Sequence, residues 1–434
     1  MRLAVIGFVL MLVLMFVLIK EKMSPPVTFI ILPLIAALAA GCSMTEIAGF
    51  IEDGMLTMLD TAVLFIFSIS YFTLMSDAGL FDPIINFLIK KTGKGLTTIF
   101  MAIVLTTFVA HLDGSGATTF LIVIPAFLPI CKRVGIRPQA LMGGMCGAYA
   151  TMNIVPWGGP TIRAASVAGI EASDLYAFIG PGVVAIALMA FVIAFVVSLI
   201  EKKNGAGVVV TAENAEATKT QETEEKSTRK WVYWFNLVMT LVMLVVLFIE
   251  QPLPLYSVFM IAFSITLVVN YPNVKEQSKK IKHYGSNAMV MCMTLFSVGI
   301  FMGVISGSGM VDAMATAIVN ALPSALAPHM HWIMAIFAVP LMMILGTDAF
   351  YYALLPIIIG VVAPFGVTSE IVAATFLLTA TFGTPVSPSV AAVYVGLGLT
   401  DITIGDHIKY TLRLVWPASI IILIVSTLLG VIQF

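Results

Sequence analysis

Two polar stretches interrupt long apolar runs in the first half of the chain. The first is Asp113-Gly114-Ser115-Gly116, which is followed by Thr118. The second begins at Asn153 and contains Pro156, Trp157, Gly158, Gly159, Pro160 and Thr161. Proline lacks a backbone donor and glycine relaxes the backbone, so both stretches should leave N–H and C=O groups unpaired. Helices that restart after such breaks direct N–H groups into the gap, which suits carboxylate ligands.

The second half of the chain has polar stretches in matching places. One is Gly346-Thr347-Asp348, and the other contains Thr384, Pro385, Ser387, Pro388 and Ser389. Together with the two stretches of the first half, and apart from Asp113 and Asp348, these residues form the predicted substrate-binding site.

Arg163 is the one cation that we expect at membrane depth. A charge there costs about 2.5 to 3.5 kcal/mol on insertion scales, so it requires an anionic partner. One interpretation is a structural ion pair with Asp113 or Asp348. The other is a planar fork that binds a carboxylate of the substrate.

Asp113 and Asp348 occupy corresponding positions in the two halves. Both could cap the helices that follow them. A carboxylate at membrane depth is also suited to carrying a proton, and we predict this role for at least one of them. His111 is adjacent to this site and could join a proton relay, although a lone histidine is more often a packed core residue.

The composition predicts the elements that hold these residues. Of the 434 residues, 60% are hydrophobic and 10% are charged, with a net charge of −1. This predicts an all-α polytopic membrane protein, without the basic surplus that nucleic acid requires. No nucleophile-base pair or metal-ligand cluster stands out, so we expect neither an enzyme nor a resident cofactor.

Apolar runs predict membrane spans near 2–20, 25–42, 57–76, 138–171, 175–200, 231–250, 254–271, 286–306, 368–399 and 408–432. The runs at 95–131 and 331–364 are each divided by a polar tip into arms too short to span, so they predict re-entrant hairpins. With both termini outside, all of the 22 Lys and Arg residues except Arg2 and Arg163 fall on the inside. This agreement with the positive-inside rule predicts a multi-pass protein of the cell membrane.

Residues 201–230 are rich in charge and lack aromatic residues, which predicts a disordered cytoplasmic linker. On either side, motifs recur at a spacing of roughly 230 residues, which predicts repeats at 1–200 and 231–434. Each repeat has an odd number of crossings, so the second should be inverted. Inverted repeats with interrupted helices are typical of secondary transporters. An ion channel or a membrane enzyme is the alternative class, but the sequence offers no open polar path and no reactive constellation.

Four segments give the sequence a specific resemblance. LDGSGATTFLIVIP, NIVPWGGPTIRAAS, GTDAFYYALLPI and FGTPVSPSVAAVYVGLG are similar to segments of the citrate-metal-proton symporters, a family of the ion transporter superfamily. The resemblance extends over essentially the whole chain. It implies uptake of citrate as a complex with a divalent cation of the Mg²⁺ or Ca²⁺ type, in symport with protons. The metal would travel with citrate, and Asp113 or Asp348 could contact it.

The resemblance also implies a homodimer that works as an elevator. The scaffold would comprise 1–76 and 231–306, and the moving transport part would comprise 95–200 and 331–434. Dicarboxylate carriers of the superfamily have Ser-Asn-Thr tips that bind sodium, whereas the tips here read Gly114-Ser115-Gly116 and Gly346-Thr347-Asp348. This departure favours protons over sodium. A proton- or sodium-coupled symporter of another di- or tricarboxylate remains the alternative.

Overall fold

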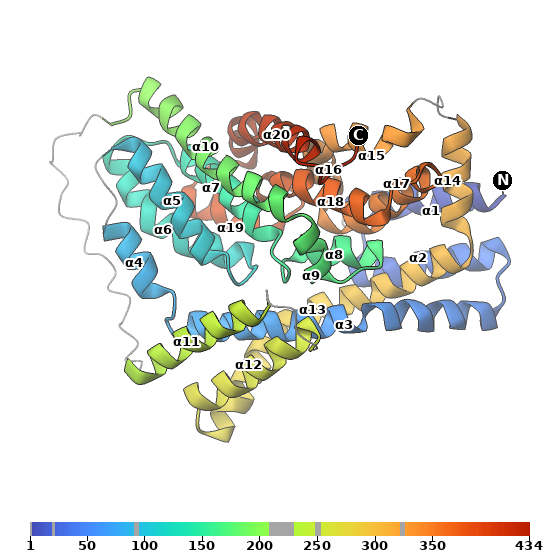
Figure 1. The fold of residues 1–434 in the computed structure, drawn as a ribbon, viewed down its shortest axis with the longest axis horizontal. Coiled ribbons are helices and arrows are strands. Elements are labelled where there is room, and N and C mark those ends of the chain that lie inside the picture. Colours follow the sequence, from blue (N-terminus) through green and yellow to red (C-terminus); the bar gives the residue numbers. More distant parts are fainter. Residues whose placement is uncertain (1, 20–21, 91–94, 208–229, 248–252, 322–325) are drawn as a thin grey trace.

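The fold is known from a computed structural model that describes residues 2–19, 22–90, 95–207, 230–247, 253–321 and 326–434 (Figure 1). Within these ranges all regular structure is helical, which confirms the predicted class. Six described helical segments are long and apolar enough to cross a bilayer: 44–77, 116–133, 180–203, 338–365, 369–386 and 404–428. Most of the predicted linker, from 208 to 229, lies outside the described residues.

The described residues of the first half form ten helices. Their bounds are α1 (Arg2–Ile19), α2 (Pro25–Ala40), α3 (Met44–Asp77), α4 (Asp82–Lys90), α5 (Leu96–Ala110), α6 (Gly116–Arg133), α7 (Pro138–Asn153), α8 (Gly159–Ala168), α9 (Ala172–Phe178) and α10 (Gly180–Lys203).

The second half follows a similar order. Its α-helices are α11 (Lys230–Leu247), α12 (Leu255–Asn270), α13 (Val274–Gly307), α14 (Met310–Ala321), α15 (Met330–Ile336), α16 (Ala338–Ala349), α17 (Leu355–Val362), α18 (Ser369–Ala380), α19 (Ala391–Thr400) and α20 (Ile404–Leu428). A π-helical turn, η2 (Phe350–Leu354), joins α16 to α17, and a 3₁₀ segment, η4 (Thr381–Val386), follows α18.

Helices α3 and α13 cross tightly along the lower side of the molecule (Figure 1). A Cβ at Gly54 would lie 2.0 Å from the carbonyl oxygen of Gly299, and one at Gly303 would lie 2.0 Å from that of Phe50. Only glycine permits this approach of the two backbones. The close crossing makes α3 and α13 the central pair of the lower layer.

Both central helices extend beyond the membrane spans predicted in them. The predicted spans are 57–76 and 286–306, whereas α3 begins at Met44 and α13 at Val274. A capping box of Ser43 and Glu46 starts α3, and the Asn273 side chain caps α13. Each helix has 34 residues and is therefore about 51 Å long. That length exceeds the roughly 30 Å hydrocarbon layer, so both helices extend beyond it.

The chain turns back at the two polar tips. Helices α5 and α6 pack side by side on either side of 111–115. By length and composition 338–365 could cross a membrane as one helix, but Gly346 has φ +72° and α17 lies against α15. The second turn is therefore built around a glycine in a backbone conformation that other residues rarely adopt.

The two halves interlock in the upper layer. Helix α6 of the first hairpin packs on α19, which follows the second break. In the corresponding way, η2 and α17 of the second hairpin pack on α8, which follows the first break. Helix α7 also packs on α20 and η4, and α18 on α8. The upper layer is thus a single body built from both halves.

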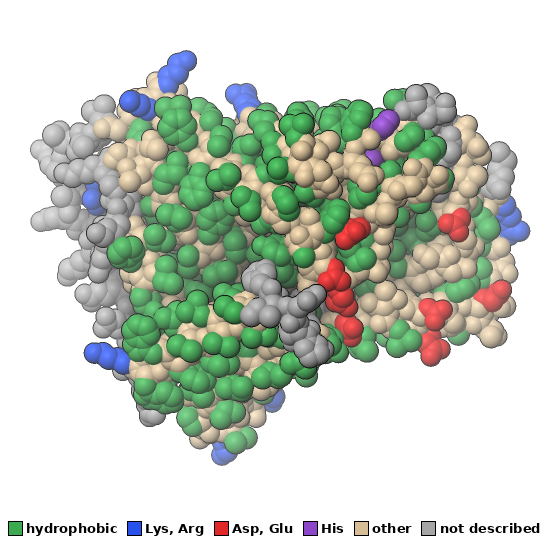
Figure 2. Space-filling view, in the orientation of Figure 1, with side chains coloured by type: hydrophobic (Ala, Val, Ile, Leu, Met, Phe, Trp, Pro, Cys, Tyr) green, Lys and Arg blue, Asp and Glu red, His purple; other side chains and the backbone are tan. Residues whose placement is uncertain are grey.

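Charge is unevenly distributed on the surface. In the face shown in Figure 2, Lys and Arg lie over the left half, apart from one group at the right edge near the start of the chain. Asp and Glu lie over the right half. The long axes of α3 and α13 run between these two ends (Figure 1). The positive-inside rule expects such a separation of charge at the two ends of helices that cross a membrane.

Candidate functional site

The first hairpin tip is fixed by local hydrogen bonds. Gly114 has φ +69°, and the Ser115 N–H donates to Asp113 Oδ1 over 2.8 Å. Ser115 Oγ caps α6 by accepting from the Thr118 N–H at 3.3 Å, and it also accepts from the Thr118 hydroxyl. The helix cap is therefore Ser115, and Asp113 stabilises the turn that precedes it.

The tip is fastened to the break between α7 and α8. Trp157 Nε1 donates to the carbonyl oxygen of Leu112 over 2.9 Å. His111 Nε2 lies 3.1 Å from Asn153 Oδ1, at the last residue of α7. A Cβ at Gly158 would lie 2.2 Å from the Asn153 carbonyl oxygen, so the break closes only with glycine there. Pro156, Gly158 and Pro160 are buried, and Gly159 is half-buried.

The second tip reaches two partners. A Cβ at Gly346 would lie 3.2 Å from Ser389 Cβ, which places this tip against the second break. The Asp348 carboxylate reaches α8, where its Oδ1 accepts from Arg163 Nε over 2.8 Å. Helix capping was one of the two roles predicted for Asp348, but no backbone N–H in the described ranges donates to its carboxylate. Thr347 is half-buried beside it.

Arg163 is only 8% exposed and lies within 6.0 Å of the Tyr352 ring centroid. Its Nε is occupied by Asp348, whereas its two Nη groups have no hydrogen bond among the described residues. The structural ion pair that we considered therefore exists. The free Nη edge still offers two donors to a carboxylate, as the other interpretation requires.

Around this pair, four buried polar side-chain atoms have no hydrogen-bond partner among the residues that the structure describes. They are Asn153 Nδ2, Thr161 Oγ1, Tyr351 OH and Thr384 Oγ1. Buried polar groups are nearly always paired, so each such atom requires an explanation. The four atoms lie at the tips and breaks, and a ligand bound there would supply the missing hydrogen-bond partners.

The second break is held from α20. His407 Nε2 donates to the Pro385 carbonyl oxygen over 2.9 Å, and His407 is fully buried. Ser387 is buried and donates to the Met343 carbonyl oxygen at 3.3 Å, whereas Pro388 and Ser389 are exposed. Sequence reasoning missed His407 and the tyrosines at 351 and 352. No spacing links His407 to the break, because the contact depends on how α20 folds back.

The structure therefore connects the two predicted tips with the two predicted breaks. Each tip contacts the break of its own half, and Asp348 also contacts α8 of the other half. No ion pair joins Asp113 to Arg163 in the part of the chain that the structure describes, so of the two predicted acidic partners Asp348 forms the ion pair. No group of three or more His, Cys, Asp and Glu in the described ranges could hold a metal ion.

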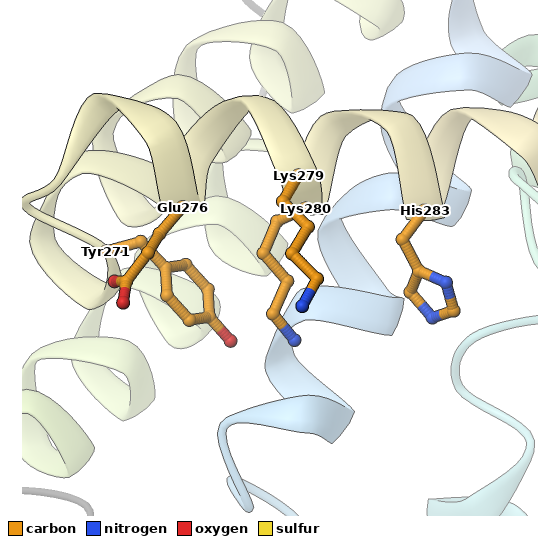
Figure 3. Close-up of a pocket in the computed structure, with 5 residues that line it drawn as sticks. All are labelled: Tyr271, Glu276, Lys279, Lys280 and His283. Carbon is orange, nitrogen blue, oxygen red and sulfur yellow. The ribbon is translucent and has the colours of Figure 1, made fainter.

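Two polar clusters lie outside the site. Glu201 of α10 accepts from Arg137 at 2.6 Å and from the Tyr410 hydroxyl at 3.2 Å, which fastens α7, α10 and α20 together. The hydrogen bond with Glu201 raises the pKa of Arg137 above its ordinary value. A surface groove of about 420 Å³ lies at the start of α13, where Lys279, Lys280 and His283 point to the same side (Figure 3). Neither cluster contains a predicted site residue.

Two helical hairpins and two interrupted helices around a buried ion pair define a membrane transporter. The fold agrees with that of a solved transporter, Alcanivorax borkumensis YdaH, with a TM-score of 0.59 over 89% of this chain and 88% of that one. The two sequences are 15% identical, so this likeness concerns the fold alone.

The family model described as "Citrate transporter" matches residues 13–383, and the chain belongs to this family. Two Bacillus subtilis (strain 168) proteins are similar along their whole length. One, named "Citrate transporter", is 34% identical over 100% of both chains. The other, named "Mg(2+)/citrate complex secondary transporter", is 33% identical over 99% of both chains. The family and these relatives are secondary transporters and not enzymes.

Proposed function

We propose that this protein imports citrate complexed with a divalent metal ion of the Mg²⁺ or Ca²⁺ class, in symport with protons. The observation that carries the proposal is Arg163, with Nε paired to Asp348 and its Nη edge unpaired among the described residues. The names of the two relatives, one of which specifies the Mg²⁺ complex, support the choice of substrate.

The charge of the site fits a metal complex better than free citrate. With carboxyl pKa values well below 7, free citrate carries about three negative charges at neutral pH, and a bound divalent metal reduces this to about one. Arg163 is the single buried arginine among the described residues at the tips and breaks, and Asp348 neutralises it. A site with one such cation can accept a single net negative charge at much lower cost than three. The metal would arrive with citrate, and hard oxygen ligands suit Mg²⁺ or Ca²⁺.

Proton coupling follows from the sharing of Arg163 by two carboxylates. When a citrate carboxylate binds the Nη edge, two negative charges lie against one guanidinium in a partly buried position. Like charges this close disfavour the ionised form, so Asp348 takes up a proton as the substrate binds. Release of the substrate leaves Arg163 with Asp348 alone and frees the proton on the other side. Asp113 is the second candidate for a proton carrier.

An elevator mechanism accounts for the two layers. The scaffold would consist of 1–76 and 231–306, around the close crossing of α3 and α13. The transport part, 95–200 and 331–434, would move as a unit because its halves interlock. The protein would work in the cell membrane as a homodimer, with both termini outside and the segment 201–230 inside.

Uptake of labelled citrate into proteoliposomes tests the proposal. Purified protein is compared with an Arg163→Ala variant, with no metal, Mg²⁺, Ca²⁺ or a chelator, and with or without an inward proton gradient. We expect uptake only with a metal, and acceleration by the proton gradient. Uptake driven by a sodium gradient without a metal would contradict the proposal and favour a carrier of another di- or tricarboxylate.

A further inference from the structure

His111 is completely buried at the end of the first hairpin arm, and both of its ring nitrogens are engaged. Nδ1 contacts the Thr119 hydroxyl, and Nε2 lies 3.1 Å from Asn153 Oδ1. Its ring centroid is 4.3 Å from that of Tyr149, which prevents the imidazole from turning freely. His111 is therefore held in one orientation between α6 and the end of α7.

The hydrogen atoms of this cluster can be assigned from its partners. Neither hydrogen-bond partner of His111 is a carboxylate, and a buried imidazolium without a hydrogen-bonded counterion is costly, which favours the neutral ring. Nε2 faces Asn153 Oδ1, which can only accept, so the proton of the neutral ring sits on Nε2 and is donated to Oδ1. Nδ1 then accepts from the Thr119 hydroxyl, whose single hydrogen would otherwise point to the Ser115 carbonyl oxygen at 2.9 Å.

This bond determines which way the Asn153 carboxamide points. With its oxygen turned toward His111, its amino group Nδ2 faces the opposite way, where it is buried and has no partner. Asn153 is the last residue of α7, directly before the break that leads to Arg163. The unpaired Nδ2 donor therefore lies at the break between α7 and α8.

We propose that His111 is a positioning residue, which orients Asn153 so that Nδ2 donates to a carboxylate oxygen of the substrate. The inference rests on the proposed function. It adds His111 as a residue that positions Asn153 without touching the substrate itself. Without the Nε2 donor the carboxamide can rotate by half a turn and present its oxygen, which repels a carboxylate. His111 would thus select for an anionic acceptor through Asn153.

A double-mutant cycle tests the inference. The variants are His111→Phe, His111→Gln, Asn153→Ala and the double variant His111→Phe/Asn153→Ala. Ligand affinity is measured by thermal stabilisation of the purified protein and by the apparent KM of uptake. We expect His111→Phe to weaken affinity about tenfold, the size expected for one hydrogen bond to a charged group. His111→Gln can still donate to Asn153 and should restore most of the affinity.

The double variant should bind no more weakly than Asn153→Ala alone, because His111 acts through Asn153. The inference would be overturned if the affinity losses of the two single variants multiplied in the double variant, or if His111→Phe kept the wild-type affinity. Asn153→Asp keeps the acceptor for Nε2 but replaces the donor by a second acceptor, and should also lose affinity. Equal or tighter binding by that variant would mean that an oxygen faces the ligand.

The ligand panel separates this inference from the proposed function. It contains citrate with and without Mg²⁺ or Ca²⁺, and a series of dicarboxylates. If a dicarboxylate stabilises the protein and metal-citrate does not, the proposed substrate is wrong. The same cycle with that dicarboxylate still decides whether residues 111 and 153 are coupled.

Discussion

Arg163 Nε and Asp348 Oδ1 lie 2.8 Å apart, although 185 residues separate them in the chain. The bond joins the helix after the first break to the tip of the second hairpin. In the proposed function a substrate carboxylate binds the Nη edge of the same Arg163 side chain, next to Asp348. Substrate binding would then depend on the position of the second hairpin tip.

Replacing Arg163 by lysine should weaken substrate binding although the charge is retained. A point donor cannot bind Asp348 through one edge and a carboxylate through the other, so we expect the apparent KM for metal-citrate to rise about tenfold or more. Arg137→Lys is the matched control, since Arg137 forms its fork with Glu201 away from the site. This control should lower the melting temperature and leave the apparent KM unchanged. Unchanged affinity in Arg163→Lys would assign Arg163 to the structural ion pair alone.

Asp348→Asn should separate citrate uptake from the proton gradient. An amide at this position cannot gain and lose a proton, so uptake should no longer respond to an imposed pH difference. Asp113→Asn is measured in parallel, because Asp113 occupies the other tip and accepts from the Ser115 N–H. Counterflow exchange of labelled citrate reports whether each variant still binds and moves substrate. Full coupling in both variants would place the proton carrier at another residue.

Thr161→Val and Thr384→Val should reduce affinity without reducing stability. Both hydroxyls are buried and unpaired, so an apolar side chain of similar shape removes no hydrogen bond from the empty protein. We expect the melting temperature without ligand to be equal or higher and the stabilisation by metal-citrate to be smaller. Thr375→Val is the control, because this buried hydroxyl donates to the Ile371 carbonyl oxygen at 2.7 Å. Wild-type affinity in both site variants would show that neither hydroxyl meets the substrate.

Gly303→Ala should destabilise the crossing of α3 and α13. The new Cβ would lie 2.0 Å from the Phe50 carbonyl oxygen, so the backbones must separate, at a cost of about 1 to 3 kcal/mol. Gly285→Ala on the same helix is the control, since nothing lies within 4 Å of its Cβ position. Thermal unfolding in detergent should show a lower melting temperature for Gly303→Ala only. Equal melting temperatures would mean that the crossing tolerates a wider separation.

Much of the architecture follows from the sequence, because bilayer-spanning helices require apolar runs and their interruptions require glycine and proline. Both breaks lie where the sequence predicts them: α7 ends at Asn153, and η4 contains Thr384 and Pro385. Helices α3 and α13 begin before the membrane spans predicted in them. Hydropathy marks the part of a helix that lies in lipid, whereas the caps at Ser43 and Asn273 set where the helix begins.

The contacts within the site could be predicted only in part. Burial of a lone arginine at membrane depth implies an acidic partner, but Asp113 and Asp348 satisfy that requirement equally well in the sequence. Which of them bonds to Arg163 depends on the packing of η2 and α17 against α8. The support that His111 and His407 give to the two breaks depends in the same way on contacts between distant helices.

The interlocking of the two halves has a consequence for biosynthesis. Helix α6 finds its partner α19 only after most of the protein has been translated, and α8 has to wait for η2 and α17. During insertion these surfaces face lipid or the insertion machinery, and no binding site exists until the last helices arrive. If the gene is split at one point between codons 207 and 230, each half should therefore be degraded rapidly when it is produced alone. The two halves should protect one another from degradation when they are produced together.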